Sequence, residues 1–550
     1  MSFPIRRRFN PCLLALGLSV ATPAVLAASP FTLNIEPLGT YASGVFDQSG
    51  AEIVAHDAKT QRLFVVNAFS GQVDVLDVRQ PAMPALLFSI DLSEYGSVVN
   101  SVDVHKGLVV AVIEDSVRTN PGRALFLDVD GKVLAAVEVG ALPDMVTFSP
   151  DGKRVLVANE GEPSDDYSVD PEGSVSIIDL PDDIGDLTQA QVRTARFDKF
   201  NDAQLDPSIR IFGPGASVAL DLEPEYITVA RDSTTAWVAL QENNAIAMLN
   251  IESGEFTELR GLGFKDHLLP GNELDVSDRD GRINITNWPV LGIYQPDSIA
   301  SYDHQGNTYI VTANEGDARA YSGFDEEARF RGLTGDTPVC ADSERFNTFY
   351  ASNEMGITTL SQLRDNANMG RLTVTKATGL REDGSCYEDI YSFGARSFSI
   401  WTADLEQVYD SGADHERITA EAFPDHFNSN HRENSFETRS DDKGPEPEGV
   451  TLAKLWGRTY AFVGLERIGG VMVHDITDPH APVFVQYLNH RDFGAAPGTA
   501  EAGDLGAEGL LVIEAHKSPI PGVPLLVVAN EVSGTTTVFR IGRDLTPRNP

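Results

Sequence analysis

The chain has 550 residues, three cysteines and a formal net charge of −39 at pH 7. Such an excess of negative charge makes nucleic acid and anionic membrane surfaces poor partners. Acidity of this size has two explanations, which are solubility and the binding of cations or basic ligands.

The N-terminal segment has the three parts of a secretory signal peptide. Arg6, Arg7 and Arg8 precede an apolar run over 13–26, and small residues follow before Ala28. The run is too short to span a membrane, so residues 1–27 are predicted to be removed on export by the general or the twin-arginine route. No later apolar stretch has the length of a membrane span, which predicts a secreted or periplasmic protein.

The remaining residues, 28–550, contain one repeated unit. Each unit opens with a residue that is usually acidic, runs into a short apolar strand, turns, and enters a second strand rich in Val, Ala and Leu. The opening residues are Glu52, Asn100, Asp144, Glu225, Asp297, Glu448 and Glu508. The second strands are expected at 63–67, 108–114, 154–160, 237–242, 309–315, 460–466 and 525–531.

Third and fourth strands follow most of these pairs, as at 72–78 with 86–92 and at 470–476 with 483–488. Four short strands per repeat are typical of a β-propeller blade. The sequence therefore predicts an all-β fold in which a single seven-bladed β-propeller domain covers 28–550. The seventh blade has three strands of its own, and the segment 32–41 is expected to supply the fourth and close the ring.

The fifth blade carries the largest insertion, at approximately 320–395. It contains Cys340 and Cys386, an even pair in an oxidising compartment, while Cys12 lies in the signal peptide. A disulfide between Cys340 and Cys386 is expected to staple the insertion. A loop of that length rarely stays ordered without a structural or functional reason.

Five segments resemble the choice-of-anchor I proteins, which are secreted bacterial propellers. They are NITNWPV at 284–290, ANEGDAR at 313–319, DDKGPEPEG at 441–449, GLERIGG at 464–470 and VANEVSG at 528–534. The resemblance covers essentially the whole mature chain and implies the propeller fold. Some members are labelled alkaline phosphatases and others resemble cell-surface glycoproteins. The C-terminus through Arg548 has no hydrophobic anchor, so release or periplasmic residence is expected.

The repeat also predicts a collar of acids around the channel mouth. The start of the first strand and the end of the second lie on one face, because the two strands are antiparallel. The second strands end at Ala68, Glu114, Glu160, Glu242, Glu315, Glu466 and Glu531. The candidate metal ligands are Glu52, Asp144, Glu160, Glu225, Glu242, Asp297, Glu315, Glu448, Glu466, Glu508 and Glu531.

Crowded carboxylates raise one another's pKa and need countercharge. Arg319, Arg396 and Arg467 are candidates for part of it, and a hard divalent ion is the candidate for the rest. Calcium fits, because it takes six to eight oxygen ligands from carboxylates and carbonyls. The alternative is that the acids cap turns by accepting hydrogen bonds from backbone N–H groups.

Three other polar groups are weaker candidates for metal binding. An acidic loop follows Glu160, with acids at 165, 166, 170 and 172, and the segment 278–283 imitates the middle of an EF-hand loop without its first and last ligands. A third group comprises Asp425, His426 and His431. Solvated loop residues explain all three, and the chain has no Gly-x-Ser-x-Gly, His-Glu-x-x-His, P-loop or Cys-x-x-Cys motif.

Two functions are compatible with this pattern. The first is a monomeric binding propeller whose acidic channel mouth holds divalent metal and an unidentified small or polymeric ligand. The second is a calcium-dependent phosphoesterase of the alkaline-phosphatase or phytase-like type, with Glu160, Glu315 and Glu466 as metal ligands or bases. The second function needs the metals to supply nearly all the positive charge at the phosphate, because Lys and Arg are scarce on the predicted face.

Overall fold

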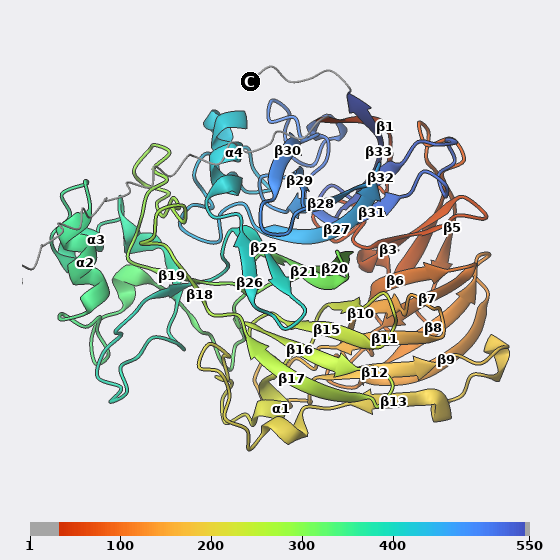
Figure 1. Ribbon diagram of the computed structural model, residues 1–550, viewed down its shortest axis with the longest axis horizontal. Coiled ribbons are helices and arrows are strands. Elements are labelled where there is room, and N and C mark those ends of the chain that lie inside the picture. The colour runs from red at the N-terminus through yellow and green to blue at the C-terminus, as the bar shows by residue number, and fades with distance from the viewer. Residues whose placement is uncertain (1–31, 545–550) are drawn as a thin grey trace, which may run out of the picture.

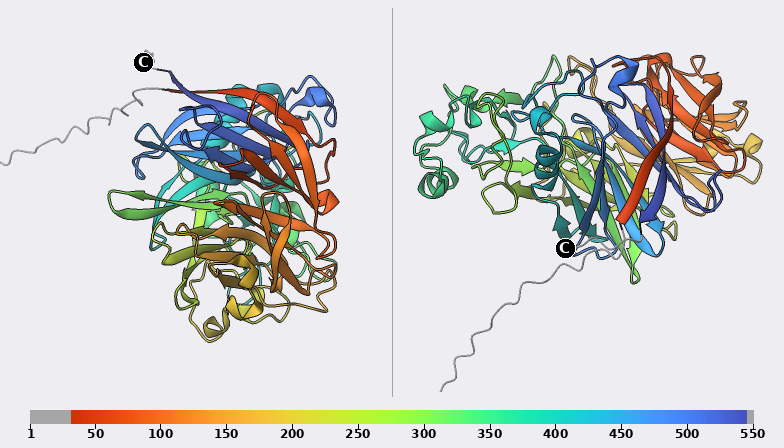
Figure 2. Two further views of the ribbon diagram at one scale, coloured as in Figure 1. Left: turned by 90° about the vertical axis from the view of Figure 1, so that its right-hand side faces the viewer. Right: turned by 90° about the horizontal axis from the view of Figure 1, so that it is seen from above.

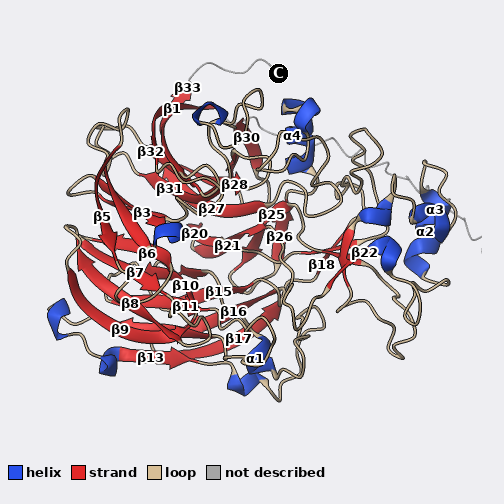
Figure 3. Ribbon diagram, turned by 180° about the vertical axis from the view of Figure 1, so that it is seen from behind, coloured by secondary structure: helices blue, strands red, loops and turns tan. Residues whose placement is uncertain are grey.

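The computed structural model describes residues 32–544, so the predicted signal peptide at 1–27 lies outside the described residues. Within this range the chain is mostly β-structure, as expected, and forms seven four-stranded antiparallel sheets (Figure 1). The helices are few and short, and they lie at the edges of the molecule (Figure 3).

The seven sheets follow one another along the chain. The first sheet contains β2 Val54–Asp57, β3 Arg62–Asn67, β4 Gln72–Asp77 and β5 Ala85–Asp91, and the second contains β6 Val99–His105, β7 Leu108–Ile113, β8 Pro121–Asp128 and β9 Val133–Ala141. The third sheet contains β10 Pro143–Phe148, β11 Arg154–Asn159, β12 Ser174–Asp179 and β13 Val192–Ala195. The fourth contains β14 Ile227–Val229, β15 Thr235–Leu240, β16 Ala245–Asn250 and β17 Glu255–Gly261. The fifth sheet contains β20 Ile299–His304, β21 Asn307–Asn314, β25 Ser397–Thr402 and β26 Gln407–Asp410. The sixth contains β27 Pro447–Leu455, β28 Arg458–Leu465, β29 Val471–Asp475 and β30 Val483–Leu488. The seventh contains β31 Ala507–Ile513, β32 Leu525–Asn530, β33 Thr535–Asp544 and β1 Thr32–Ala42.

The first strands of the sheets lie side by side in a closed cycle. Strand β2 contacts β6, and the cycle continues through β10, β14, β20, β27 and β31 back to β2. Their residues line one central cavity of about 220 Å³, to which all seven first strands or the residues just before them contribute. This arrangement is consistent with a β-propeller.

The two ends of the described chain meet in the seventh sheet, as the sequence predicts. Strand β1 pairs antiparallel with β33, and its register runs from Leu33 opposite Arg543 to Ala42 opposite Thr535. This pairing ties the N-terminal strand to the C-terminal sheet as its outer strand and covers the edge that β33 would otherwise expose.

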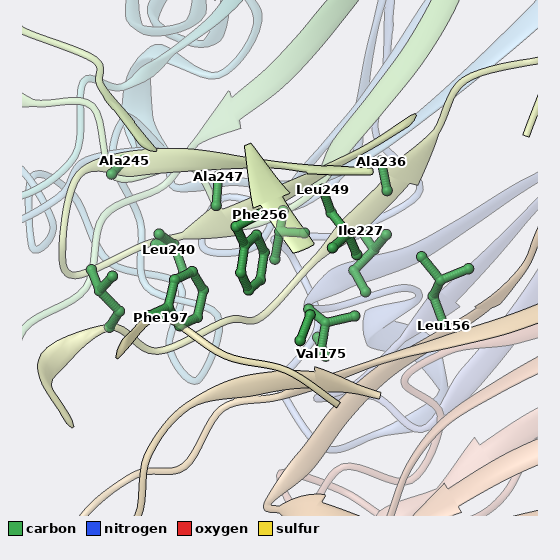
Figure 4. Packing of buried hydrophobic residues seen from close by; sticks show 14 of the residues in the cluster. Leu156, Val175, Phe197, Ile227, Ala236, Leu240, Ala245, Ala247, Leu249 and Phe256 are labelled. Carbon is green, nitrogen blue, oxygen red and sulfur yellow. The ribbon is translucent and has the colours of Figure 1, made fainter. Parts of the chain in front are cut away.

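The core lies between neighbouring sheets. Second and third strands are buried on both faces, which explains their runs of Val, Ala, Leu and Ile. Between the third and fourth sheets, Phe197 stacks on Phe256 with ring centroids 4.1 Å apart, and Val175, Ile227 and Leu249 pack around them (Figure 4). Burial of such side chains contributes about 1.5–3 kcal/mol each.

A lobe projects from the fifth sheet (Figure 2). It contains β22 Glu327–Arg329, α2 Glu344–Ser352, α3 Leu360–Leu363, β23 Thr373–Thr375 and β24 Tyr391–Ser392, all between β21 and β25. The disulfide Cys340–Cys386 lies in this insertion, as expected. The lobe also includes β18 Phe264–Asp266 and β19 Leu291–Ile293, which precede the fifth sheet; β19 lies between β18 and β24 and pairs with both.

The lobe has its own apolar core, in which Trp288 from the earlier segment packs against Phe349 of α2. The predicted insertion at 320–395 is therefore only part of this unit, because the segment 264–293 has no repeated pattern that marks it. The remaining α-helices are α1 Val218–Asp221 and α4 Asp414–Ala422. In the part of the chain that the structure describes, no helix is long and apolar enough to cross a membrane.

Candidate metal centre at the channel mouth

Bulges in the first strands turn the repeated acids toward the channel mouth. The ladder of β10 with β11 skips Asp144, and the ladder of β6 with β7 skips Asn100. The ladders of β27 and β31 shift across Glu448 and Glu508 in the same way. A bulge re-aims the side chain of the extra residue, so one backbone device presents a polar group from four different sheets.

Glycine after two of these acids lets neighbouring first strands approach closely. A Cβ on Gly449 would lie 2.0 Å from the carbonyl oxygen of Glu508, and a Cβ on Gly509 would lie 2.0 Å from that of Glu52. No other residue fits at these distances. The Glu-Gly pairs in the sequence therefore serve close packing between sheets as well as the placement of carboxylates.

The second strands deliver their acids to the same place. Glu160, Glu315, Glu466 and Glu531 each follow directly after the last residue of a second strand, and Glu242 follows two residues after β15. Carboxylate oxygens from both sets come within 4.8 Å of one another in several groups. The groups are Glu160, Glu225 and Glu242; Glu52, Glu508 and Glu531; Asp297, Glu315 and Glu448; Glu315, Glu446 and Glu466; and His431, Glu466 and Glu531.

Glu160, Glu225 and Glu242, named here the open trio, join the third sheet to the fourth. Within residues 32–544 no lysine, arginine or histidine forms an ion pair with any of the three. Glu225 and Glu242 are 8 % and 3 % exposed, and the Oε2 atom of each is buried without a hydrogen-bond partner. Burial and mutual repulsion raise the pKa of Glu160 and of Glu225 well above the usual range.

Glu315, Glu446 and Glu466, named here the paired trio, join the fifth sheet to the sixth. The Nζ of Lys443 lies 2.5 Å from Glu315 Oε1 and 3.0 Å from Glu446 Oε2. Arg467 lies 2.9 Å from both Glu446 and Glu466. Although burial acts to raise it, the pKa of Glu446 is held well below the usual range by these cations and by Arg439.

A third group, named here the seam trio, joins the last sheet to the first. Glu508 and Glu531 come from the seventh sheet and Glu52 precedes the first. In the described part of the chain none of them has an ion pair, and burial raises the pKa of Glu52 to about 7 and that of Glu531 to about 8. All three are partly exposed, unlike Glu225 and Glu242.

The other predicted residues lie at or near the mouth in different roles. Asp144 is outside the open trio, but burial and the charge of Glu242 raise its pKa to about 7. Glu114 is half-buried and accepts a hydrogen bond from Ser97. A cavity of about 190 Å³ at the mouth is lined by Glu52, Ala68, Asn100, Asp144, Asp297 and Glu508.

Of the three arginines predicted as countercharge, only Arg467 forms ion pairs with a collar acid. Arg319 is buried against Asp221 and Glu223, at 2.6 Å and 2.8 Å. Arg396 pairs with Glu416 at 2.6 Å. These two arginines therefore neutralise acids behind the collar.

Sequence reasoning missed Lys443 and Glu446, which lie in the connection before the sixth sheet and not at a repeat position. The signal for them was the motif DDKGPEPEG, in which both occur.

Of the weaker candidates, His431 lies at the collar, and the others that follow are engaged elsewhere. Asp278 pairs with Arg371 and Asp280 with Arg282, so the segment that imitates an EF-hand is held by arginines. His426 stacks on Phe493 with ring centroids 4.5 Å apart. His431 lies 3.2 Å from Glu466 and beside Arg467.

Repeated four-stranded sheets with buried carboxylates gathered at one mouth define a β-rich protein with candidate metal-binding clusters. The chain belongs to the choice-of-anchor I domain family, whose sequence profile matches residues 52–479. Gigasin-3a of Magallana gigas is 30 % identical over 204 residues, which cover 35 % of this chain and 71 % of that protein. A mesenchyme-specific cell surface glycoprotein of Strongylocentrotus purpuratus is 26 % identical over 299 residues, which cover 51 % of this chain and 37 % of that protein.

Solved structures resemble the chain only distantly. Hydrazine synthase of Kuenenia stuttgartiensis has a TM-score of 0.44 and 13 % identity, with 91 % of this chain and 99 % of that chain covered. The WD40 domain of Toxoplasma gondii coronin has a TM-score of 0.45 and 8 % identity, with 94 % and 88 % covered.

Proposed function

We propose that this chain is an exported, seven-bladed β-propeller that binds a divalent cation, calcium, at the acidic mouth of its channel. The observation that carries the proposal is the open trio, in which the buried Glu225 and Glu242 meet the half-buried Glu160, and none of the three forms an ion pair within residues 32–544. The disulfide Cys340–Cys386 supports residence in an oxidising compartment such as the periplasm or the exterior.

The spacing of the oxygens supports an ion of calcium's size. Ligands bound to calcium lie about 2.3–2.6 Å from the ion, so any two lie within about 5 Å of each other. The open trio places one oxygen from each of Glu160, Glu225 and Glu242 within 4.8 Å of the others. The donor set is oxygen only, which favours calcium or magnesium over zinc and copper.

Energetics point the same way. A buried carboxylate without countercharge is costly, and it lowers that cost either by taking up a proton or by binding a cation. The Oε2 atoms of Glu225 and Glu242 are buried without a hydrogen-bond partner, so each can still accept a proton or a cation. The seam trio offers a second, more exposed site of the same chemistry, and Glu315 of the group with Asp297 and Glu448 is already paired with Lys443.

Calorimetric titration of chelator-treated protein with calcium tests the proposal. The wild type is expected to bind calcium, and Glu242→Gln is expected to lose one equivalent without loss of fold. Glu114→Gln is the matched control, because Glu114 has the same repeat position but belongs to none of the close carboxylate groups. An unchanged stoichiometry in Glu242→Gln contradicts the assignment to the open trio.

A calcium-dependent phosphoesterase is the alternative function, with Glu160, Glu315 and Glu466 as ligands or bases. Lys443 and Arg467 add positive charge at the mouth, but both are held in ion pairs with Glu446. Bound metal would therefore have to supply the charge that a phosphate needs. Hydrolysis of p-nitrophenyl phosphate by calcium-loaded protein, lost in Glu315→Gln, supports this alternative, and no turnover above blank from folded, calcium-loaded protein removes it.

A further inference from the structure

A second pocket lies away from the acidic collar, at the seam where the two chain ends pair. Its volume is about 360 Å³, which is the size of a small-ligand site. It is formed by the end of β1, by the loop that precedes β31, and by the turn between β32 and β33. Val45, Phe46 and Leu505 give it an apolar wall, and none of the collar acids lines it.

A buried carboxylate organises the polar side of this pocket. Asp504 is 7 % exposed and has no lysine or arginine partner among residues 32–544. Its Oδ1 accepts hydrogen bonds from the hydroxyls of Thr535 and Thr537, at 2.7 Å and 2.8 Å. Its Oδ2 lies 3.0 Å from His490 Nδ1, which donates because a carboxylate only accepts.

These bonds fix the direction of every hydroxyl around Asp504. Since the protons of Thr535 and Thr537 are committed to Asp504, Ser533 donates to Thr535 at 2.8 Å and Thr40 donates to Thr537 at 2.9 Å. A hydroxyl has one proton and two lone pairs, and the N–H of Leu505 donates to Ser533 Oγ at 3.0 Å, so Ser533 keeps one lone pair and Thr40 two at the pocket wall. The wall therefore offers hydrogen-bond acceptors, which suit a ligand with several donors.

His490 completes the wall with its remaining ring nitrogen. With Nδ1 committed to Asp504, only Nε2 is free, and the side chain is 44 % exposed where it lines the pocket. The loop that bears it is held rigidly. A Cβ on Gly503 would lie 2.1 Å from the carbonyl oxygen of His490, and Arg491 donates to the carbonyls of Asn430 and Glu433.

Charge decides the class of ligand. The net charge of −39 and the nearby Asp504 disfavour an anion. A cation is disfavoured whenever His490 is protonated, and the hydrogen bond that His490 donates to Asp504 raises the pKa of His490. A neutral ligand with many hydroxyls suits both states of the imidazole, and its apolar face can pack against the ring of Phe46, which is 36 % exposed.

We infer that this pocket binds a neutral sugar ring, with its hydroxyls on His490, Ser533 and Thr40 and its apolar face against Phe46. The inference does not depend on calcium at the collar. The pocket recognises the sugar as a polyol. The hydroxyls of the ligand donate hydrogen bonds to Ser533 and Thr40, whose own protons are directed toward the threonines that bind Asp504.

Saturation-transfer NMR of the full mature chain tests the inference with glucose, galactose, mannose and N-acetylglucosamine, each with and without calcium. At least one sugar is expected to show transfer in both conditions, and the affinity is expected to fall at least fivefold in Phe46→Ala and in His490→Ala. Phe69→Ala is the matched control, because Phe69 is 60 % exposed and lies outside the pocket.

Three results overturn the inference. They are no transfer to any of the four sugars, transfer that is unchanged in both pocket variants, and preferential binding of benzoate or benzylamine as charged probes. Phe46 is a surface side chain, so loss of fold in Phe46→Ala is not expected, and circular dichroism checks it. If no sugar binds while calcium still binds, the sugar-binding inference fails and the proposal for the metal centre is unaffected.

Discussion

The open trio and the paired trio show two ways in which the fold accommodates three carboxylates placed close together. Each brings three carboxylates together between neighbouring sheets, with oxygens within 4.8 Å. In the paired trio Lys443 enters from a connecting loop, and Arg467 adds a second cation. In the open trio no cation of the described chain forms an ion pair, and Arg118 and Arg319 act on Glu160 and Glu242 only from a longer distance. The comparison indicates that the fold satisfies one acidic junction internally and leaves the other for a cation from solution.

The largest expected effect comes from removing the internal cation. Lys443→Met leaves Glu315 and Glu446 buried beside each other, which is expected to lower the free energy of unfolding by about 3–5 kcal/mol. Chemical denaturation of metal-free protein measures it. Lys153→Met is the control, since its ion pair with Asp151 is exposed and long at 3.8 Å, and a loss below about 1 kcal/mol is expected there. An equal loss of unfolding free energy in the two variants would contradict the claim that Lys443 neutralises the paired trio.

Calcium is expected to have the next largest effect. At a free concentration one hundred times its Kd, calcium is expected to stabilise the wild type by about 2.7 kcal/mol. Thermal or chemical unfolding with and without calcium measures this gain. It is expected to shrink in Glu242→Gln and to persist in Glu114→Gln. A gain that survives in Glu242→Gln would place the ion elsewhere.

Calcium affinity is expected to rise with pH. The raised pKa values of Glu160 and Glu225 mean that these two carboxyl groups keep their protons to a higher pH than free carboxyl groups do, and calcium must displace those protons. The affinity is therefore expected to rise about tenfold or more between pH 6 and pH 8. Calorimetry in two buffers of different ionisation enthalpy is expected to show proton release. A pH-independent affinity would mean that the carboxylates are already ionised.

The smallest expected effect concerns Glu225→Gln without metal. A carboxyl group with a raised pKa in the folded state binds more protons folded than unfolded, so it lowers stability as pH rises from about 4.5 through its raised folded-state pKa. Removal of this group is expected to be nearly neutral at pH 5 and to stabilise the protein by about 1 kcal/mol at pH 8. Denaturant unfolding at the two pH values checks the sign. Destabilisation at pH 8 would indicate that Glu225 has an unseen partner.

The sequence allowed the repeated part of the molecule to be predicted well. Seven opening residues and seven second strands occur at the expected places, because each repeats one strand pattern and one bulge or turn. The closing pair of β1 with β33 and the disulfide Cys340–Cys386 also follow from the pattern and the cysteine count.

The countercharge could not be predicted from the repeat. Lys443 and Glu446 belong to a connection that occurs once, so no period marks them. Arg319 and Arg396 belong to conspicuous segments, yet they pair with Asp221 and Glu416 behind the collar. Nor could the segment 264–293 be assigned to the lobe, because its contact with α2 is made across the chain and not within a repeat.

A crystal structure of the mature chain grown with calcium tests the central claim most directly. The account predicts an ion with ligands from Glu160, Glu225 and Glu242, at oxygen distances of about 2.3–2.6 Å, and no ion in the paired trio. An empty open trio at saturating calcium, with its carboxyl groups hydrogen-bonded to each other, would contradict it.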